Sequence, residues 1–364
     1  MADQDLRQVM HPRLPLPQDV VAYLARMEAS GVYSNQGPLV RELERRHAER
    51  LGVDAECVVA LASGTAALTS AVATSVATHW RVPAFTFPAS AHAVVNAGRV
   101  LMLCDVDPQT WQIRAAQLRS GEGLLPVLPF GAPVDMAAWP ADAPVVIDAA
   151  ASLGAVGEGI AGLPPDWCVA FSLGATKMLA CGEGGLVVCG NRSRAGEIRS
   201  WSHFALDSDR RSTGPGTNAA MPEVSAAYGL ASLDRWDADR RLWERARQRA
   251  VQHSHHWPGL PHGEGMHPYW IVDFGNGDTA RLAEQSLAAR GIASRRWWGP
   301  GLHRMPAFAD HQGGFPVTEH LADSTLGLPF WRDITAEQAA EVGEVLASLS
   351  AETDLPGSLR SERG

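Results

Sequence analysis

Short apolar runs alternate with Ala-rich segments along the first half of the chain. Helices are indicated at segments such as Thr65–Val76 and Ser90–Ala97. Continuous apolar strands separated by helices are typical of a mainly parallel sheet covered on both faces, so the pattern predicts an α/β fold. The last strand follows its predecessor closely enough to allow an antiparallel pairing there. The predicted strands are Cys57–Leu61, Arg81–Phe85, Val100–Val106, Leu124–Phe130, Val145–Asp148, Cys168–Ser172 and Gly185–Cys189.

The second half begins with a long helical pattern from Pro222 to about His253, which leads out of the first region. A Pro-, Gly- and His-rich break follows. A smaller α+β region is then predicted, with a strand around Tyr269–Phe274, a helix around Thr279–Arg290 and strand-like residues near Ile292–Trp297. We expect four parts: an N-terminal arm (1–22), a large domain (23–240), a small C-terminal domain (241–352) and a disordered tail (353–364).

A final helix is predicted to begin at Thr335. Thr335 and Gln338 fit a capping box, and Ile334 is placed to act as a hydrophobic staple. The helix would bury one apolar face against the small domain. That face consists of Val342, Val345, Leu346 and Leu349.

Composition narrows the function classes. The 46% apolar and 20% charged residues suit a soluble globular protein, and a net charge of −9 argues against a nucleic-acid or anionic-membrane binder. No apolar run approaches the ~20 residues that a membrane-spanning helix needs, and the polar, Pro-rich start differs from a signal peptide. The five scattered cysteines are interpreted as buried thiols of a cytoplasmic protein. His253, His255 and His256 lack acidic or cysteine partners at ligand spacing and are interpreted as solvated, so no metal site is expected.

Lysine usage is the most informative count. Lysine and arginine together number 31, and Lys177 is the only lysine. Arginine stays protonated in proteins, whereas lysine becomes an amine nucleophile once its pKa is lowered. Chance could leave one lysine anywhere, but the apolar, Gly-rich surroundings of Lys177 do not suit an idle solvated ammonium. A catalytic or Schiff-base role is therefore predicted.

Three predicted strand ends complement this lysine. Ser63, Gly64 and Thr65 open a helix directly after a strand, which suits a phosphate, although a plain helix cap would use the same residues. Asp148 ends a buried strand, where it could pair with a protonated ring nitrogen or merely cap the next turn. Ser172 ends another strand shortly before Lys177. Phosphate cup, carboxylate and amine are the three groups that pyridoxal phosphate needs.

Several segments, in order, resemble the DegT/DnrJ/EryC1/StrS sugar aminotransferases, a family of fold-type-I pyridoxal-phosphate enzymes. The resemblance covers nearly the whole chain, and the combined order and spacing are more specific than any single motif. The segments are SNQGPLVRELE (34–44), ASGTAAL (62–68), VPAFTFPASAHAV (82–94), VVIDAAASLGA (145–155), FSLGATKMLACGEGGLVV (171–188), GTNAAMPEVSAAYGLASL (216–233) and FPVTEHLADSTLGLPFW (315–331).

The resemblance implies a role for each matching residue. Lys177 would form the Schiff base with the cofactor and later shuttle a proton. Asp148 would pair with the pyridinium nitrogen. Gly64, Thr65 and Ser172 would bind the phosphate.

Two further matches concern the ring and the assembly. Phe87 lies where the family stacks an aromatic ring on the cofactor, although an ordinary core aromatic is the alternative. Asn218 matches an asparagine that reaches the phosphate from the second subunit. The resemblance therefore implies a homodimer with shared active sites.

Three positions depart from the family pattern. Ala151 stands where the family has Gln, Pro129 where it has His, and Ala220 where it has Arg. These positions border the ring hydroxyl and the substrate, so the cofactor assignment is unaffected and the substrate is left open.

The expected function is transfer of an amino group from glutamate or glutamine to a keto sugar or related cyclic ketone, in secondary metabolism or glycan biosynthesis. A non-sugar keto substrate and a non-catalytic cofactor-binding relative are the alternatives. Dehydration is disfavoured because Lys177 is present and the cysteines are scattered. Trp297, Trp298 and His303 could wall the pocket or serve a core or interface, and Glu183 is interpreted as a loop residue.

Overall fold

The computed structural model describes residues 6–34, 36–114, 119, 121–133, 135–154, 160–254, 257–261, 266–311 and 313–352. The tail predicted at 353–364 and the histidines His255 and His256 lie outside the described residues. Within the described part of the chain, no helix is long and apolar enough to cross a membrane.

A seven-stranded sheet forms the centre of the first region, with strand order β1-β7-β6-β5-β4-β2-β3. Strand β7 pairs antiparallel with β1 and β6, and the other pairs are parallel. The α/β class is thereby confirmed, including the antiparallel pairing of the last strand. The strands are β1 (Val58–Leu61), β2 (His79–Pro83), β3 (Val100–Cys104), β4 (Gly123–Leu124), β5 (Val145–Asp148), β6 (Trp167–Ser172) and β7 (Gly185–Cys189).

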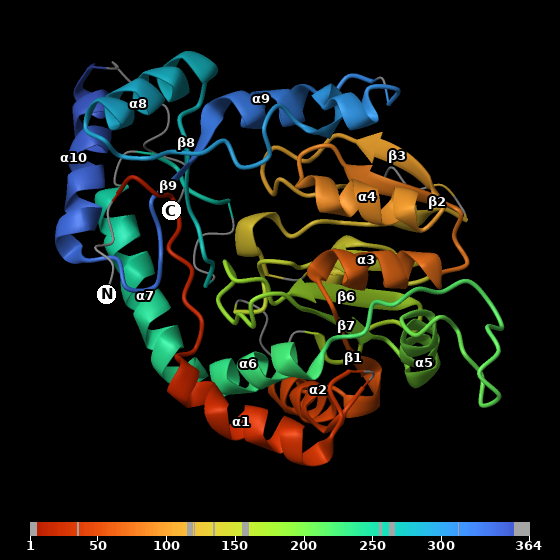
Figure 1. Ribbon diagram of the computed structural model, residues 1–364. Coiled ribbons are helices and arrows are strands. Elements are labelled where there is room, and N and C mark those ends of the chain that lie inside the picture. The colour runs from red at the N-terminus through yellow and green to blue at the C-terminus, as the bar shows by residue number, and fades with distance from the viewer. Residues whose placement is uncertain are drawn as a thin grey trace.

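Helices cover both faces of this sheet because its strands are apolar on both sides. In β5, Val145 and Ile147 join one core cluster, while Val146 joins the other. Figure 1 shows α3 and α4 in front of the strands, with α1, α2 and α6 packed together at one end. These helices are α1 (Pro17–Ser30), α2 (Pro38–Leu51), α3 (Gly64–Ala73), α4 (Pro88–Asn96), α5 (Arg192–Trp201) and α6 (Glu223–Asp234).

A smaller region contains the antiparallel pair β8 and β9, with helices α7, α8 and α10 around it. The predicted capping box is confirmed: the Thr335 amide donates to Gln338 Oε1 (2.9 Å), and the Gln338 amide donates to Thr335 Oγ1 (3.2 Å). The apolar face predicted for this last helix is fully buried. The elements are α7 (Trp236–His253), β8 (Trp270–Asp273), α8 (Gly277–Ala289), α9 (Pro316–Ser324), β9 (Thr325–Leu328) and α10 (Ala336–Glu352). Short 3-10 turns of the described residues include η1 (Ala55–Cys57), η3 (Pro129–Gly131), η4 (Met136–Ala138), η6 (Leu302–Arg304) and η7 (Pro306–Phe308).

The strand predicted at Leu124–Phe130 is wrong over most of its length. Strand β4 ends at Leu124, a single bridge joins Val127 to Asp148, and η3 follows. Pro126 and Pro129 explain the difference, since proline has no N–H to donate to a neighbouring strand.

Two predictions in the second half also need correction. The long helix predicted from Pro222 to His253 is two helices that meet at Arg235, because α6 packs on α2 while α7 packs on α10. The strand-like residues Ile292–Trp297 form only one bridge, between Arg295 and Gly327.

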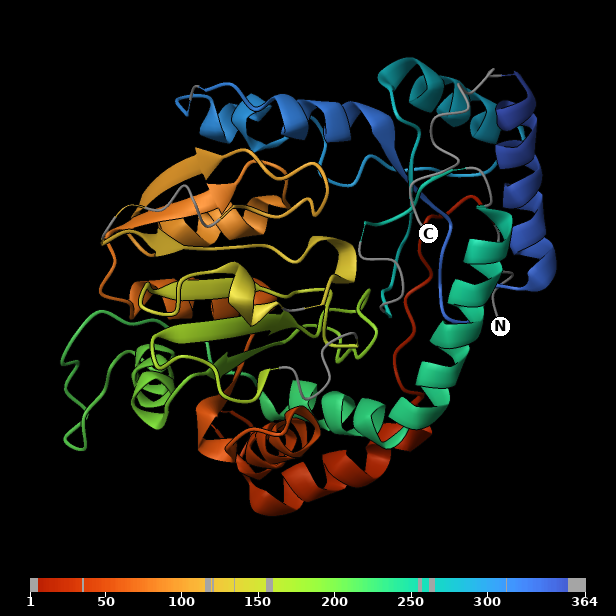
Figure 2. The ribbon, with the colours of Figure 1, turned by 180° about the vertical axis from the view of Figure 1, so that it is seen from behind.

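The N-terminal segment (residues 6–13) lies against the smaller region. The Ala293 amide donates to the Leu6 carbonyl (2.7 Å), and the Phe330 amide donates to the Val9 carbonyl (2.9 Å). Figure 2 shows this segment, in red, rising beside α7 toward the small sheet. The boundaries expected at residues 22 and 240 fall inside helices α1 and α7.

Candidate active site

Six of the seven predicted site residues line one cavity of about 480 Å³. They come from the carboxyl ends of β1, β5 and β6 and from the loops that follow β2 and β6. Ligands of open α/β sheets bind at this edge. The six residues are Gly64, Thr65, Phe87, Asp148, Ser172 and Lys177.

At the phosphate cup predicted from sequence, the backbones of three segments approach closely: the ends of β1 and β6 and the start of β7. Gly185 of β7 pairs with Leu61 on one side and Ser172 on the other, so it brings the end of β1 next to the end of β6. A Cβ on Gly185 would lie 2.3 Å from the Ser63 carbonyl oxygen, and a Cβ on Gly64 would lie 2.8 Å from Ser172 Cβ. Both glycines are therefore required by the packing.

The same place has the donors that an anion needs. Ser63 Oγ caps helix α3 by accepting from the Ala66 amide (3.1 Å). The first amides of a helix have no partner within it, and the helix dipole is positive at this end. Ser172 contributes a hydroxyl beside Gly64. Amides, hydroxyl and a cradle that a Cβ would fill fit the phosphate of pyridoxal phosphate.

Asp148 ends β5 at the base of the cavity, where it is 6% exposed. Ser90 Oγ donates to its Oδ2 (2.7 Å) and the Ala150 amide donates to its Oδ1 (3.1 Å). Burial raises the pKa of Asp148, and these hydrogen bonds and the Lys177 charge oppose that effect. The carboxylate has no ion-pair partner of its own among the described residues, which suits a cationic ring nitrogen.

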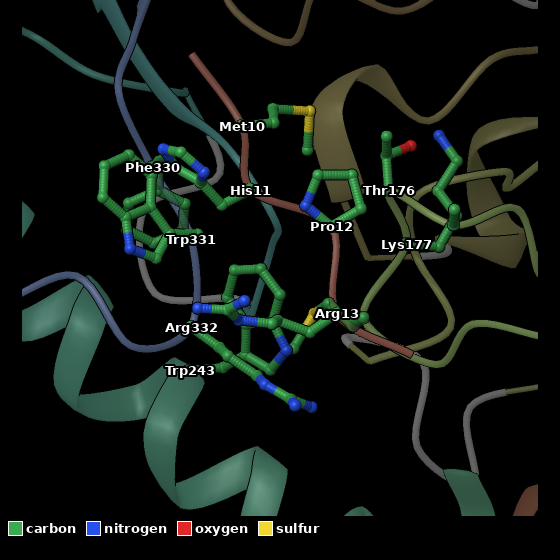
Figure 3. Close-up of a pocket in the computed structure, with 12 residues that line it drawn as sticks. Met10, His11, Pro12, Arg13, Thr176, Lys177, Trp243, Phe330, Trp331 and Arg332 are labelled. Atoms are coloured by element: carbon green, nitrogen blue, oxygen red, sulfur yellow. The ribbon is translucent and has the colours of Figure 1, made fainter. Parts of the chain in front are cut away.

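Lys177 follows β6 on a tight turn, in which its amide donates to the Gly174 carbonyl (2.9 Å). Its Nζ donates to the Tyr269 hydroxyl (3.1 Å), which comes from the smaller region. Figure 3 shows the outer side of this turn, where Pro12 and Arg13 of the N-terminal segment lie between the turn and Phe330–Arg332. The turn that carries the amine is thus packed from both sides.

Phe87 lines the cavity with 59% of its surface exposed, so its ring is not used in the core. Asn218, in contrast, is exposed, pairs with His203 and does not line the cavity of its own chain. Ala220 lines a separate hollow together with Gln36 and His203. A role for this segment at the cavity would need a second chain.

Tyr269 and Arg295 also line the cavity, and no sequence motif singled them out. Neither belongs to a motif at a strand end, and both reach the cavity only because the two regions pack together. Glu183, expected to be a simple loop residue, also lines it.

The sequence left undecided whether Trp297, Trp298 and His303 line the pocket, and the structure separates the tryptophans from the histidine. Trp297 and Trp298 form a wall of the cavity, and Trp298 stacks on Phe130 at 4.1 Å with an interplanar angle of 10°. His303 is buried and its Nε2 lies 3.1 Å from Glu319 Oε1. It serves the packing of α9 rather than the cavity. Among the described residues, no group of three metal-ligating side chains gathers.

Fold and site together define a pyridoxal-phosphate enzyme, and comparison with known proteins gives its family. The model of the DegT/DnrJ/EryC1/StrS aminotransferase family matches residues 16–347. The chain belongs to this family and is a pyridoxal-phosphate-dependent aminotransferase.

Several relatives of the chain are named for sugar substrates or products. The chain is 29% identical to GDP-perosamine synthase of Caulobacter vibrioides, with 87% of this chain and 90% of that protein covered. It is also 29% identical to UDP-N-acetyl-3-dehydro-alpha-D-glucosamine 3-aminotransferase of Acidithiobacillus ferrooxidans, covering 91% and 94%. DesI, solved in the presence of its TDP-sugar product, is 28% identical with a TM-score of 0.82, covering 97% and 95%.

Replacing Gly64 with Ala is expected to weaken binding of pyridoxal phosphate by at least about tenfold. The new methyl group would lie 2.8 Å from Ser172 Cβ and push this residue, with its hydroxyl, away from the start of the helix. Cofactor titration followed by absorbance measures the affinity. Gly196→Ala is the matched control, because a Cβ on that α5 glycine meets nothing within 4 Å. Equal affinity of the two variants for pyridoxal phosphate would contradict phosphate binding at Gly64.

Replacing Asp148 with Asn is expected to stabilise the cofactor-free protein while weakening cofactor binding. Because burial raises the folded-state pKa of Asp148, stability is lost as the pH rises from the unfolded value near 3.9 through the folded pKa. Asn carries no charge, so its advantage in the free energy of unfolding should grow as the pH is raised from about 4 to neutrality. Urea titrations across this range test the trend. A variant that is less stable than wild type at the upper end would refute it.

Proposed function

We propose that this enzyme moves an amino group from glutamate or glutamine to the keto group of a sugar or related cyclic ketone, in secondary metabolism or glycan biosynthesis. The observation that carries the proposal is the placement of Lys177, the only lysine, in one cavity with Asp148 and the Gly64–Ser172 cup. Each of the three groups would hold a different part of one pyridoxal phosphate molecule. The family membership adds the amino-transfer reaction.

Lys177 is the residue we assign to attachment of the cofactor and then to proton transfer. The bound cofactor supplies an electron sink for the carbon that loses its proton. Lys177 Nζ must accept that proton as a neutral amine and return it at the neighbouring position. The Tyr269 hydroxyl, 3.1 Å away, gives the amine a fixed partner when it is free.

Asp148 would keep the ring nitrogen protonated. Its two oxygens are held by Ser90 and by the Ala150 amide, so the carboxylate is fixed before the ring arrives. Thr86 Oγ1 lies 3.0 Å from Ser90 Oγ and extends this support. Phe87 would cover one face of the ring, which accounts for its exposed position.

Two observations support a cyclic acceptor. Relatives over most of the chain are named for nucleotide-linked sugars. Trp297 and Trp298 line the cavity, and Phe130 stacks on Trp298; flat apolar indole rings suit the C–H face of a ring. Ala151 lines the cavity and Pro129 precedes Phe130, so two departures from the family lie at this wall. For this reason the proposal includes cyclic ketones other than nucleotide sugars.

A homodimer would complete the site. Asn218 and Phe204 belong to the segment between α5 and α6, and both are exposed, Phe204 by 46%. Figure 1 shows this segment extending away from the sheet. An asparagine with no function in its own cavity is available to the phosphate cup of a second copy. The buried, unpaired state of all five cysteines supports placing the enzyme in the reducing cytoplasm.

Borohydride reduction of the cofactor-loaded protein should attach the cofactor to Lys177 alone, and glutamate or glutamine should convert the cofactor to its amine form before reduction. Peptide mass analysis identifies the labelled residue without ambiguity, because the chain has no other lysine. Adding keto sugars, free or nucleotide-linked, should restore the original absorbance. A protein that binds the cofactor yet yields no amine form with any amino acid would be a non-catalytic relative.

Replacing Asn218 with Ala should weaken cofactor binding by about 10- to 100-fold, since a hydrogen bond to a charged group is worth ~1.5–3 kcal/mol. Gel filtration with light scattering, run beside the cofactor titration, shows whether the dimer persists. Thr217→Ala is the neighbouring control on the same exposed segment. A monomer with full cofactor occupancy would exclude a shared site.

A further inference from the structure

Arg295 is a cation on the cavity wall for which the described residues provide no carboxylate. It lines the cavity together with Lys177, and its side chain is exposed. The guanidinium carbon lies 4.8 Å from the centre of the Trp297 ring. No ion pair or side-chain hydrogen bond of Arg295 occurs among the described residues, so its five N–H donors face the cavity or solvent.

The adjacent arginine shows how different this is. Arg296 forms an ion pair with Glu284 (2.8 Å) and donates to the carbonyls of Ala322 (3.0 Å) and Asp323 (2.6 Å). It is therefore fully used in holding α8 and α9 together. Of the two consecutive arginines, Arg296 therefore stabilises the fold, whereas Arg295 is available to bind a ligand in the cavity.

The backbone of Arg295 is fixed although its side chain is free. Its amide donates to the Gly327 carbonyl (2.9 Å), and the Gly327 amide donates to the Arg295 carbonyl (2.8 Å). Gly327 has no room for a side chain, since a Cβ there would lie 2.0 Å from Trp297 Nε1. The indole beneath the guanidinium is held in place by the same strand.

A row of contacts connects this cation with the reacting amine. The rings of Trp297 and Tyr269 have centres 5.0 Å apart in an edge-to-face arrangement. Tyr269 in turn accepts the hydrogen bond from Lys177 Nζ. Arg295, Trp297, Tyr269 and Lys177 therefore form one wall of the cavity, with a cation at each end.

We propose that Arg295 binds a carboxylate of the amino-acid donor. The proposal rests on the function proposed above, because it needs an amino acid whose nitrogen reaches Lys177. The cavity also holds Asp148 and Glu183, so an anionic donor needs a compensating cation. Lys177 serves the chemistry, and Arg295 is the other cationic side chain among the described lining residues. A guanidinium matches a carboxylate in two parallel hydrogen bonds.

The test compares Arg295→Gln with Arg296→Gln in cofactor-loaded enzyme. Single-turnover conversion of the cofactor to its amine form is followed by absorbance with three donors. These are glutamate, glutamine, which lacks the side-chain carboxylate, and glutamate α-amide, which lacks the α-carboxylate. Binding of glutarate, a dicarboxylate without an amine, is measured separately by calorimetry and does not depend on turnover.

We expect Arg295→Gln to lose about 10- to 100-fold in the glutamate half-reaction and in glutarate affinity. One of the two amide analogues should then react equally in wild type and variant, and its missing carboxylate is the one that Arg295 binds. Arg296→Gln should match wild type with every donor, although its loss of the Glu284 pair lowers thermal stability.

Equal glutamate kinetics and glutarate affinity in Arg295→Gln and wild type would overturn the proposal, as would a defect confined to the acceptor half-reaction. Failure of the wild-type enzyme with all three donors would instead count against the proposed function. Glutarate binding would still report on Arg295 in that case, so the two failures are distinguishable.

Discussion

The close approach of three strand ends at Gly185 is the constraint on which the rest of the site depends. Without a side chain at this position, the Ser63 carbonyl lies almost against β7, and helix α3 begins beside Ser172. A phosphate bound there is anchored by backbone amides, which move less than side chains. In the proposed function, fixing that end of the cofactor would also set where its ring nitrogen and carbonyl lie, and Asp148 and Lys177 are at strand ends on the same edge. Backbone packing therefore sets the geometry in which the side chains react.

The site combines a rigid half with a half contributed by the second region. Gly64, Asp148, Ser172 and Lys177 all belong to the large sheet and its turns. Tyr269, Arg295, Trp297 and Trp298 come from the smaller region, and an aromatic cluster that includes Phe85 and Phe130 joins the two. Cofactor chemistry is thus placed on the sheet, whereas the surface that a substrate would meet lies at the junction. A change in how the regions pack would alter substrate contacts without disturbing the cofactor cup.

Sequence patterns could bring Gly64, Asp148, Ser172 and Lys177 together at one cavity, because each of these residues lies at or just after the end of a strand. The same patterns could not find Tyr269 and Arg295, whose positions depend on contacts between regions far apart in the chain. The strand expected through Phe130 was wrong for a local reason. Pro129 interrupts pairing, and Phe130 adopts a left-handed conformation (φ 54°) that turns its ring toward Trp298. A hydrophobic run predicts a strand but not a residue in a left-handed conformation within it. The stacking of Phe130 on Trp298 could therefore not be predicted from the sequence.

The N-terminal segment that packs behind the Lys177 turn also has a consequence for how the chain folds during synthesis. The Val9 carbonyl accepts a hydrogen bond from the Phe330 amide, and Arg13 pairs with Asp333 (3.3 Å). These first residues are therefore synthesised long before their partners. The large sheet can assemble earlier, because its strands end at Cys189. Contacts of such high sequence separation are slow to form. We therefore expect the sheet to be built before the turn that carries Lys177 gains its outer support, because that support needs residues 330–333.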